Sequence, residues 1–102
     1  MKKELKGQVS QDQLDKWKKE VGHVWEVTIE ESVCYLKKAS RATLRAALTF
    51  LEKDKIKYME IIVENCWLGG DENIKKEDDY FYGLMGVVPE LVEAKDAVIK
   101  KH

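Results

Sequence analysis

The chain of 102 residues has no long apolar run, a single proline and no segment dominated by glycine, proline or serine. A membrane-spanning helix needs about 20 consecutive apolar residues, so none is expected. The first residues carry charge without an apolar stretch behind them, which predicts no signal peptide. At this length we expect one domain over residues 1–102, with residues 1–9 frayed.

Reactive side chains are also scarce. Cys34 and Cys66 lack the spacing of a metal site, and their apolar neighbours predict buried free thiols. Apart from His102, the sole histidine is His23, so a general base or metal ligand would have few partners. We therefore expect a protein that is not an enzyme and that holds no metal and no cofactor.

Charge is balanced overall but unevenly placed along the chain. The net charge is −1, which predicts no strong attraction to nucleic acid or to a membrane. Residues 1–57 carry 13 Lys/Arg and 9 Asp/Glu, a net of +4, whereas residues 58–102 carry 5 and 10, a net of −5. The pattern is typical of scattered solvated faces, and it also fits a two-signed surface that docks head to tail.

The first half of the chain predicts a helix followed by a β-hairpin. Ser10 and Gln13 form a capping-box pattern, and Gly22 is placed to end the helix that follows. Apolar and polar residues alternate over residues 23–29, and residues 32–37 form a second β-prone run. We expect an antiparallel hairpin with helices covering one face, because a lone hairpin is marginal in water.

The second half predicts helices. Residues 40–53 and 54–67 begin with N-cap residues and keep a helical apolar period. A last helix should start at residue 78 or 79 and run to about residue 100, with a kink near Pro89. The predicted fold class is therefore α+β: a short N-terminal helix, a β-hairpin, and three helices packed on the hairpin.

The stretch from Trp67 to Phe81 is the most distinctive part of the chain. Gly69 and Gly70 predict a helix C-cap with a reversal of direction. The acids that follow would repel phosphate, and their spacing does not match a calcium-binding EF-hand loop. No ligand chemistry is therefore predicted here.

The same stretch predicts a protein contact patch. Tyr80, Phe81 and Tyr82 are consecutive, so a helix cannot bury all three against one neighbour. Aromatic residues rimmed by charge are typical of interface anchors. The predicted partner-binding residues are Leu68, Ile74, Tyr80 and Phe81, with Asp71 and Glu72 on the rim.

A basic cluster offers a different function. Lys37, Lys38, Arg41 and Arg45 lie at the hairpin end and the helix start, with Tyr35 nearby. Such a cluster is usually a solvated face, but it also fits a small nucleic-acid-binding regulator. This alternative stays open, although the near-neutral net charge makes nucleic acid an unlikely partner.

Several short motifs extend from the hairpin to the last helix. They are Tyr35-Leu36-Lys37-Lys38-Ala39-Ser40-Arg41, Leu44, Glu64-Asn65-Cys66-Trp67-Leu68-Gly69-Gly70-Asp71-Glu72 and Asp78-Asp79-Tyr80-Phe81. Their arrangement resembles proteins of tailed-phage and prophage structural modules, some of which are similar to tail assembly chaperones. The chain departs from that pattern at Ala39, where a proline is common.

The resemblance implies a non-enzymatic phage assembly protein that binds a tail protein, such as the tape measure or tube protein, in the cytoplasm of a bacterial host. A structural or packaged virion component is the alternative, with the virion as its location. A homo-oligomer is compatible with either role, and no membrane contact is expected.

Overall fold

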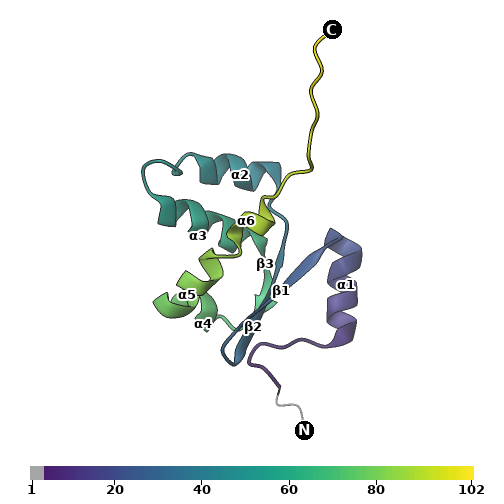
Figure 1. Ribbon diagram of the computed structural model, residues 1–102. Coiled ribbons are helices and arrows are strands. Elements are labelled where there is room, and N and C mark those ends of the chain that lie inside the picture. The colour runs from purple at the N-terminus through teal and green to yellow at the C-terminus, as the bar shows by residue number, and fades with distance from the viewer. Residues whose placement is uncertain (1–3) are drawn as a thin grey trace.

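The computed structural model describes residues 4–102 as an α+β fold built on a three-stranded antiparallel sheet (Figure 1). This confirms the predicted fold class and the hairpin. The strands are β1 (Val24–Ile29), β2 (Ser32–Lys37) and β3 (Trp67–Gly70), in the order β1-β2-β3. The helices are α1 (Gln11–Val21), α2 (Arg41–Leu48), α3 (Lys55–Cys66), α4 (Asn73–Lys76), α5 (Asp78–Met85) and α6 (Val88–Leu91).

Helices α1, α2 and α3 begin with the N-cap side chains that the sequence predicts. The hydroxyl oxygens of Ser10 and Ser40 each accept a hydrogen bond from a backbone N–H three residues on, at 3.1 Å. A carboxylate oxygen of Asp54 accepts from the Lys57 N–H at the same distance. Each cap satisfies a donor that the first turn of a helix leaves unpaired.

The third strand was not predicted. Gly69 and Gly70 do not cap α3; they run beside β2, with Gly70 opposite Cys34. A Cβ atom on Gly70 would lie 2.5 Å from the Cα of Cys34 and from the carbonyl oxygen of Val33. The missing side chain therefore allows two backbones to approach closely. The predicted C-cap reversal is wrong for this reason.

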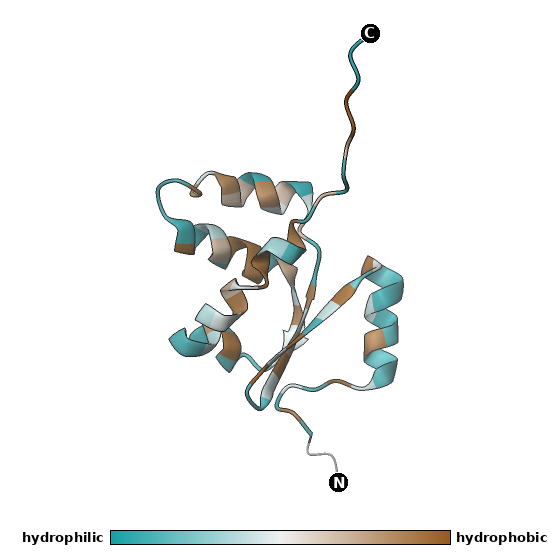
Figure 2. Ribbon diagram, viewed as in Figure 1, coloured by the Kyte–Doolittle hydropathy of each residue, from teal (hydrophilic) through white to brown (hydrophobic). Residues whose placement is uncertain are grey.

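The core lies between the sheet and helices α2 to α6. Strand β2 is central, so neighbouring strands protect both of its edges, and all of its residues except Lys37 are buried. Cys34 and Leu36 face the helices. Figure 2 shows that α3 supplies much of the hydrophobic surface on this side. The buried cluster comprises Cys34, Leu36, Ala47, Ile62, Val63, Cys66, Ile74, Leu84, Val88 and Leu91.

Helix α1 covers the opposite face of the sheet. The rings of Trp17 and Tyr35 lie 5.6 Å apart, and the Trp17 ring also lies against Gly69. The N–H of Val9 donates to the Tyr35 hydroxyl oxygen at 3.4 Å. Successive residues of a strand point to opposite faces, so Tyr35 serves this side while Cys34 and Leu36 serve the core.

The predicted fraying of residues 1–9 is wrong for part of the segment. Residues 1–3 lie outside the described chain. The N–H of Lys6 donates to the Glu31 carbonyl oxygen at 2.8 Å, and the Lys6 carbonyl oxygen accepts from the Val33 N–H at 2.9 Å. These bonds pair Lys6 with the start of β2 as a parallel bridge.

The predicted long last helix is also wrong. Helix α5 ends at Met85, and Pro89 is the second residue of the single turn of α6, where its missing N–H breaks no helical bond. The chain leaves α6 after Val92 and stays extended and exposed through residues 93–102, which we call the C-terminal segment (Figure 1). Residues 93–102 are exposed and bury no apolar face against the body, and a short helix without such packing is marginal in water.

Candidate contact surface

Strand β3, helix α4 and the start of α5 form a corner at one end of the sheet (Figure 1). The corner contains every residue that the sequence assigns to partner binding. The structure divides them into buried residues, residues that tie the corner to the sheet, and residues that are partly open to solvent. Only the last group is available to a partner.

Ile74 belongs to the core, and its predicted place near the surface is wrong. Its side chain is fully buried, because it is the one apolar residue of α4 and this single turn packs against β2. Leu68 is half-buried within β3. Of the two predicted apolar contact residues on β3 and α4, only Leu68 is therefore partly open to solvent.

Asp71 fastens the corner to the hairpin. One carboxylate oxygen accepts from the Ser32 hydroxyl at 2.7 Å, and the other accepts from the Asn73 N–H at 3.0 Å. The Ser32 hydrogen bond, and then the Asn73 one, lower the pKa of the Asp71 carboxyl. Asp71 therefore holds the corner against the start of β2, in addition to its predicted place on the rim of the contact patch.

Glu72 is exposed and pairs with Lys75. The Lys75 ammonium lies 2.9 Å from Glu72, 3.8 Å from Glu64 and 4.5 Å from the centre of the Trp67 ring. A single exposed ion pair contributes little to the stability of a folded protein. Together these contacts hold the Lys75 side chain over Trp67.

The three aromatic residues of α5 are not equivalent. Tyr80 and Phe81 are half-buried and pack against the core, whereas Tyr82 is 55% exposed. The sequence predicts that at least one of the three is exposed, and this is confirmed. It does not identify Tyr82 as that residue, because the choice depends on where the core lies around α5.

Phe81 and Tyr82 line a groove of about 300 Å³ between α3 and α5. Its other apolar wall is Ile56, on the first turn of α3, which is 51% exposed. Two further exposed leucines, Leu48 and Leu51, lie in the stretch that leads into α3. The charged residues that line the groove are Glu60, Lys75, Lys76 and Asp78. We call the groove lined by Ile56, Phe81, Tyr82 and these four charged residues the α3–α5 groove.

Sequence reasoning missed Ile56, Leu48 and Leu51 as surface residues. All three follow the helical period that predicts core positions. Their exposure arises because α2 and α3 pack on each other and extend beyond the sheet at this end (Figure 1). The period shows which face of a helix is apolar, but not how far its neighbours reach.

The basic cluster lies elsewhere and lacks its aromatic partner. Lys38, Arg41 and Arg45 are exposed, and Lys37 is half-buried at the end of β2. Tyr35 is only 1% exposed and packs on Trp17, so it offers no ring face for stacking on a base. The expectation that Tyr35 supports a nucleic-acid contact is wrong.

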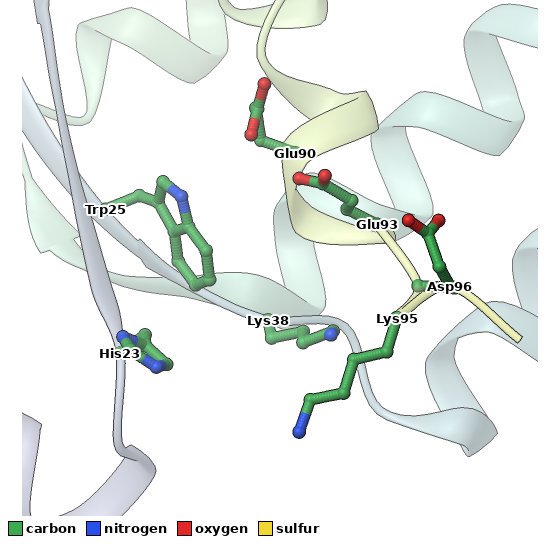
Figure 3. Close-up of a pocket in the computed structure, with 8 residues that line it drawn as sticks. His23, Trp25, Lys38, Glu90, Glu93, Lys95 and Asp96 are labelled. Atoms are coloured by element: carbon green, nitrogen blue, oxygen red, sulfur yellow. The ribbon is translucent and has the colours of Figure 1, made fainter.

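A second cavity, of about 490 Å³, lies at the start of β1 (Figure 3). Trp25, His23 and Lys38 line one side of it. Glu90 and residues 93–96 line the other, where the C-terminal segment begins. His23 is exposed, with its ring 6.0 Å from that of Trp25.

Both cysteines are buried free thiols, as predicted. Desolvation raises the pKa of Cys34 to about 12 and that of Cys66 to about 11, which keeps both protonated and unreactive near neutral pH. Within residues 4–102, no group of three or more His, Cys, Asp or Glu side chains is arranged to hold a metal ion. No helix in the same range is long and apolar enough to cross a membrane.

Comparison of the chain with known proteins finds no matching family model, no matching curated protein and no matching solved structure.

Proposed function

We propose that this protein is a non-enzymatic phage assembly protein that acts like a tail assembly chaperone. In this role it holds a segment of a long tail protein, such as the tape measure, in the bacterial cytoplasm until the tail tube forms. One observation carries the proposal: the α3–α5 groove exposes Ile56 and Tyr82 beside charges of both signs. The motif resemblance to phage structural-module proteins supports the choice of partner.

The chemistry of the groove favours an amphipathic helix as its occupant. A groove that sets three apolar side chains among charged ones matches a helix that places apolar residues at i, i+3 and i+4 and charges beside them. Glu60 on α3 and Asp78 on α5 suit basic residues of such a helix, and Lys76 suits an acidic residue. Tyr82 is the natural anchor, because aromatic side chains dominate binding energy at protein interfaces.

The test is co-purification from cells that express the tagged protein together with the tail proteins of its module. Mass spectrometry then identifies what is captured. Tyr82→Glu places a charge in the lining of the groove and should reduce recovery of the long tail protein at least about tenfold. Ala42→Glu is the matched control, since it adds the same charge at an exposed site at the start of α2, outside the groove.

Two outcomes contradict the proposal. One is that no long tail protein co-purifies with the wild-type chain. The other is that Tyr82→Glu and Ala42→Glu recover equal amounts of it. Finding the protein in purified mature virions would instead favour a structural or packaged virion component, because a chaperone leaves before the particle is complete.

A further inference from the structure

Strand β1 is an open edge of the sheet. It pairs with β2 over its whole length, and within residues 4–102 no second strand pairs with its other side. The pairing is regular, without the bulge that interrupts β2 and β3, and the strand contains no proline. A regular, unprotected edge of six residues is a template for another strand.

The C-terminal segment has the properties of a strand without a sheet. It is extended from residue 93 onward and projects away from the body (Figure 1). Val98 and Ile99 are 95% and 96% exposed, and they form a hydrophobic stretch halfway along the segment (Figure 2). Two adjacent β-branched residues with no packing partner favour pairing with a sheet edge.

From these two features we propose that the C-terminal segment of one copy adds to the β1 edge of a second copy, and that the exchange is reciprocal, giving a closed dimer. Such strand addition supplies backbone hydrogen bonds to an edge that lacks them. Reciprocal exchange uses the same surfaces on both copies, so the assembly closes at two chains.

Charge complementarity supports this occupant and sets its direction. The β1 hairpin exposes Glu26 and Glu30, whereas the end of the C-terminal segment carries Lys100 and Lys101. In a parallel arrangement these lysines approach Glu30 at the end of β1. Asp96, near the start of the segment, then lies by Lys38 at the other end. An antiparallel arrangement would reverse both pairings and bring like charges together.

The side chains also fit by face. Trp25 and Val27 point toward the core side of β1, and Glu26 points to the other side. If Ile99 lies on the side of Val27, then Lys100 lies on the side of Glu26 and within reach of it. The cavity beside Trp25 leaves room for an incoming apolar side chain (Figure 3).

A second copy is a better occupant than the chain's own segment. The Ala39 N–H donates to the Leu91 carbonyl oxygen at 2.9 Å, which fixes the root of the segment beside the start of α2. Residues 93–96 line the cavity opposite Trp25, and the rest of the segment projects away from the body and from its own β1 (Figure 1). The exposed residues Val98 and Ile99 are therefore presented to a second copy rather than to the chain's own strand.

Sedimentation of the full chain over a range of concentrations tests the proposal. The wild type should form dimers, and the double variant Val98→Asp, Ile99→Asp should raise the dimer dissociation constant at least about 100-fold. Ala42→Glu, which adds an acid at an exposed site on α2, should dimerise like the wild type. Urea unfolding of each monomer verifies that the variants fold. A wild type that is monomeric at all concentrations, or a double variant that dimerises equally well, overturns the proposal.

Cross-linking tells exchange from folding back. Thr28→Cys and Lys100→Cys are made in separate chains of different mass, mixed and oxidised. A disulfide between the two different chains is expected, because both positions are exposed and should meet in the dimer. If the cross-link forms only when both cysteines are in one chain, the segment folds back on its own β1 and the exchange is wrong. Neither sedimentation nor cross-linking depends on partner capture by the α3–α5 groove, so failure of the dimer and failure of the proposed function can be told apart.

Discussion

Gly70 is the residue on which the third strand depends. Its φ of +131° is strained for any side chain, and a Cβ atom there would meet backbone atoms of β2 that cannot move aside. We expect Gly70→Ala to lower the free energy of unfolding by about 3 kcal/mol, measured by urea denaturation. Gly22→Ala is the matched control, since Gly22 has a φ of +86° but open space around it.

The control should lose only about 1 kcal/mol, the part that comes from the backbone conformation alone. Equal losses at Gly70 and Gly22 would mean that close approach to Cys34 does not matter. The same pair shows what a sequence can tell about glycine. It predicts positive φ at both positions, but it cannot tell a helix end from a strand that must pass close to another backbone.

Residue types in the corner illustrate a second limit. The sequence assigns Ile74 and Tyr80 to the contact patch, yet Ile74 is buried and the exposed tyrosine is Tyr82. Ile74 is buried by the single turn of α4, which the sequence does not signal, because its four residues are too few to show a period. Burial at this scale is decided by tertiary packing.

At the scale of elements, α1 is the helix held least firmly. None of its residues is fully buried, and at 11 residues it is too short to be stable alone in water. Its main anchor is Trp17, which packs on Tyr35 and Gly69. We expect Trp17→Ala to cost about 2 kcal/mol and to remove hydrogen-exchange protection from α1 while β2 stays protected.

Trp17→Phe should retain most of that protection, because it keeps an aromatic ring over the sheet. If β2 loses protection together with α1 in Trp17→Ala, then α1 is part of one cooperative unit with the core. In that case the expectation that α1 opens independently of β2 would be wrong.

Local signals predict where elements begin better than where they end. The caps at Ser10, Ser40 and Asp54 depend on neighbours three residues away, so the sequence contains all the information they need. The prediction of a long last helix is wrong although Val98 and Ile99 keep a helical period with Leu91. Both side chains are almost fully exposed, so a helix there would bury no apolar face. An apolar period predicts a helix only where there is something to pack against.

The whole molecule combines a compact body with a projecting segment. Its radius of gyration is 15.4 Å and its longest dimension 61 Å, whereas a compact chain of this length has a radius of about 13 Å. The C-terminal segment accounts for the excess, since it extends beyond the helices (Figure 1). It contributes no residue to the buried core.

Truncation after Val92 should therefore leave the body intact. In dilute solution, where the wild type is monomeric, the free energy of unfolding should change by less than about 0.5 kcal/mol. The radius of gyration from small-angle scattering should fall to about 13 Å. A loss above about 1 kcal/mol would mean that the segment packs on its own body. At higher concentration only the full chain should gain stability, because dimer formation stabilises by mass action and the truncated chain has no segment to exchange.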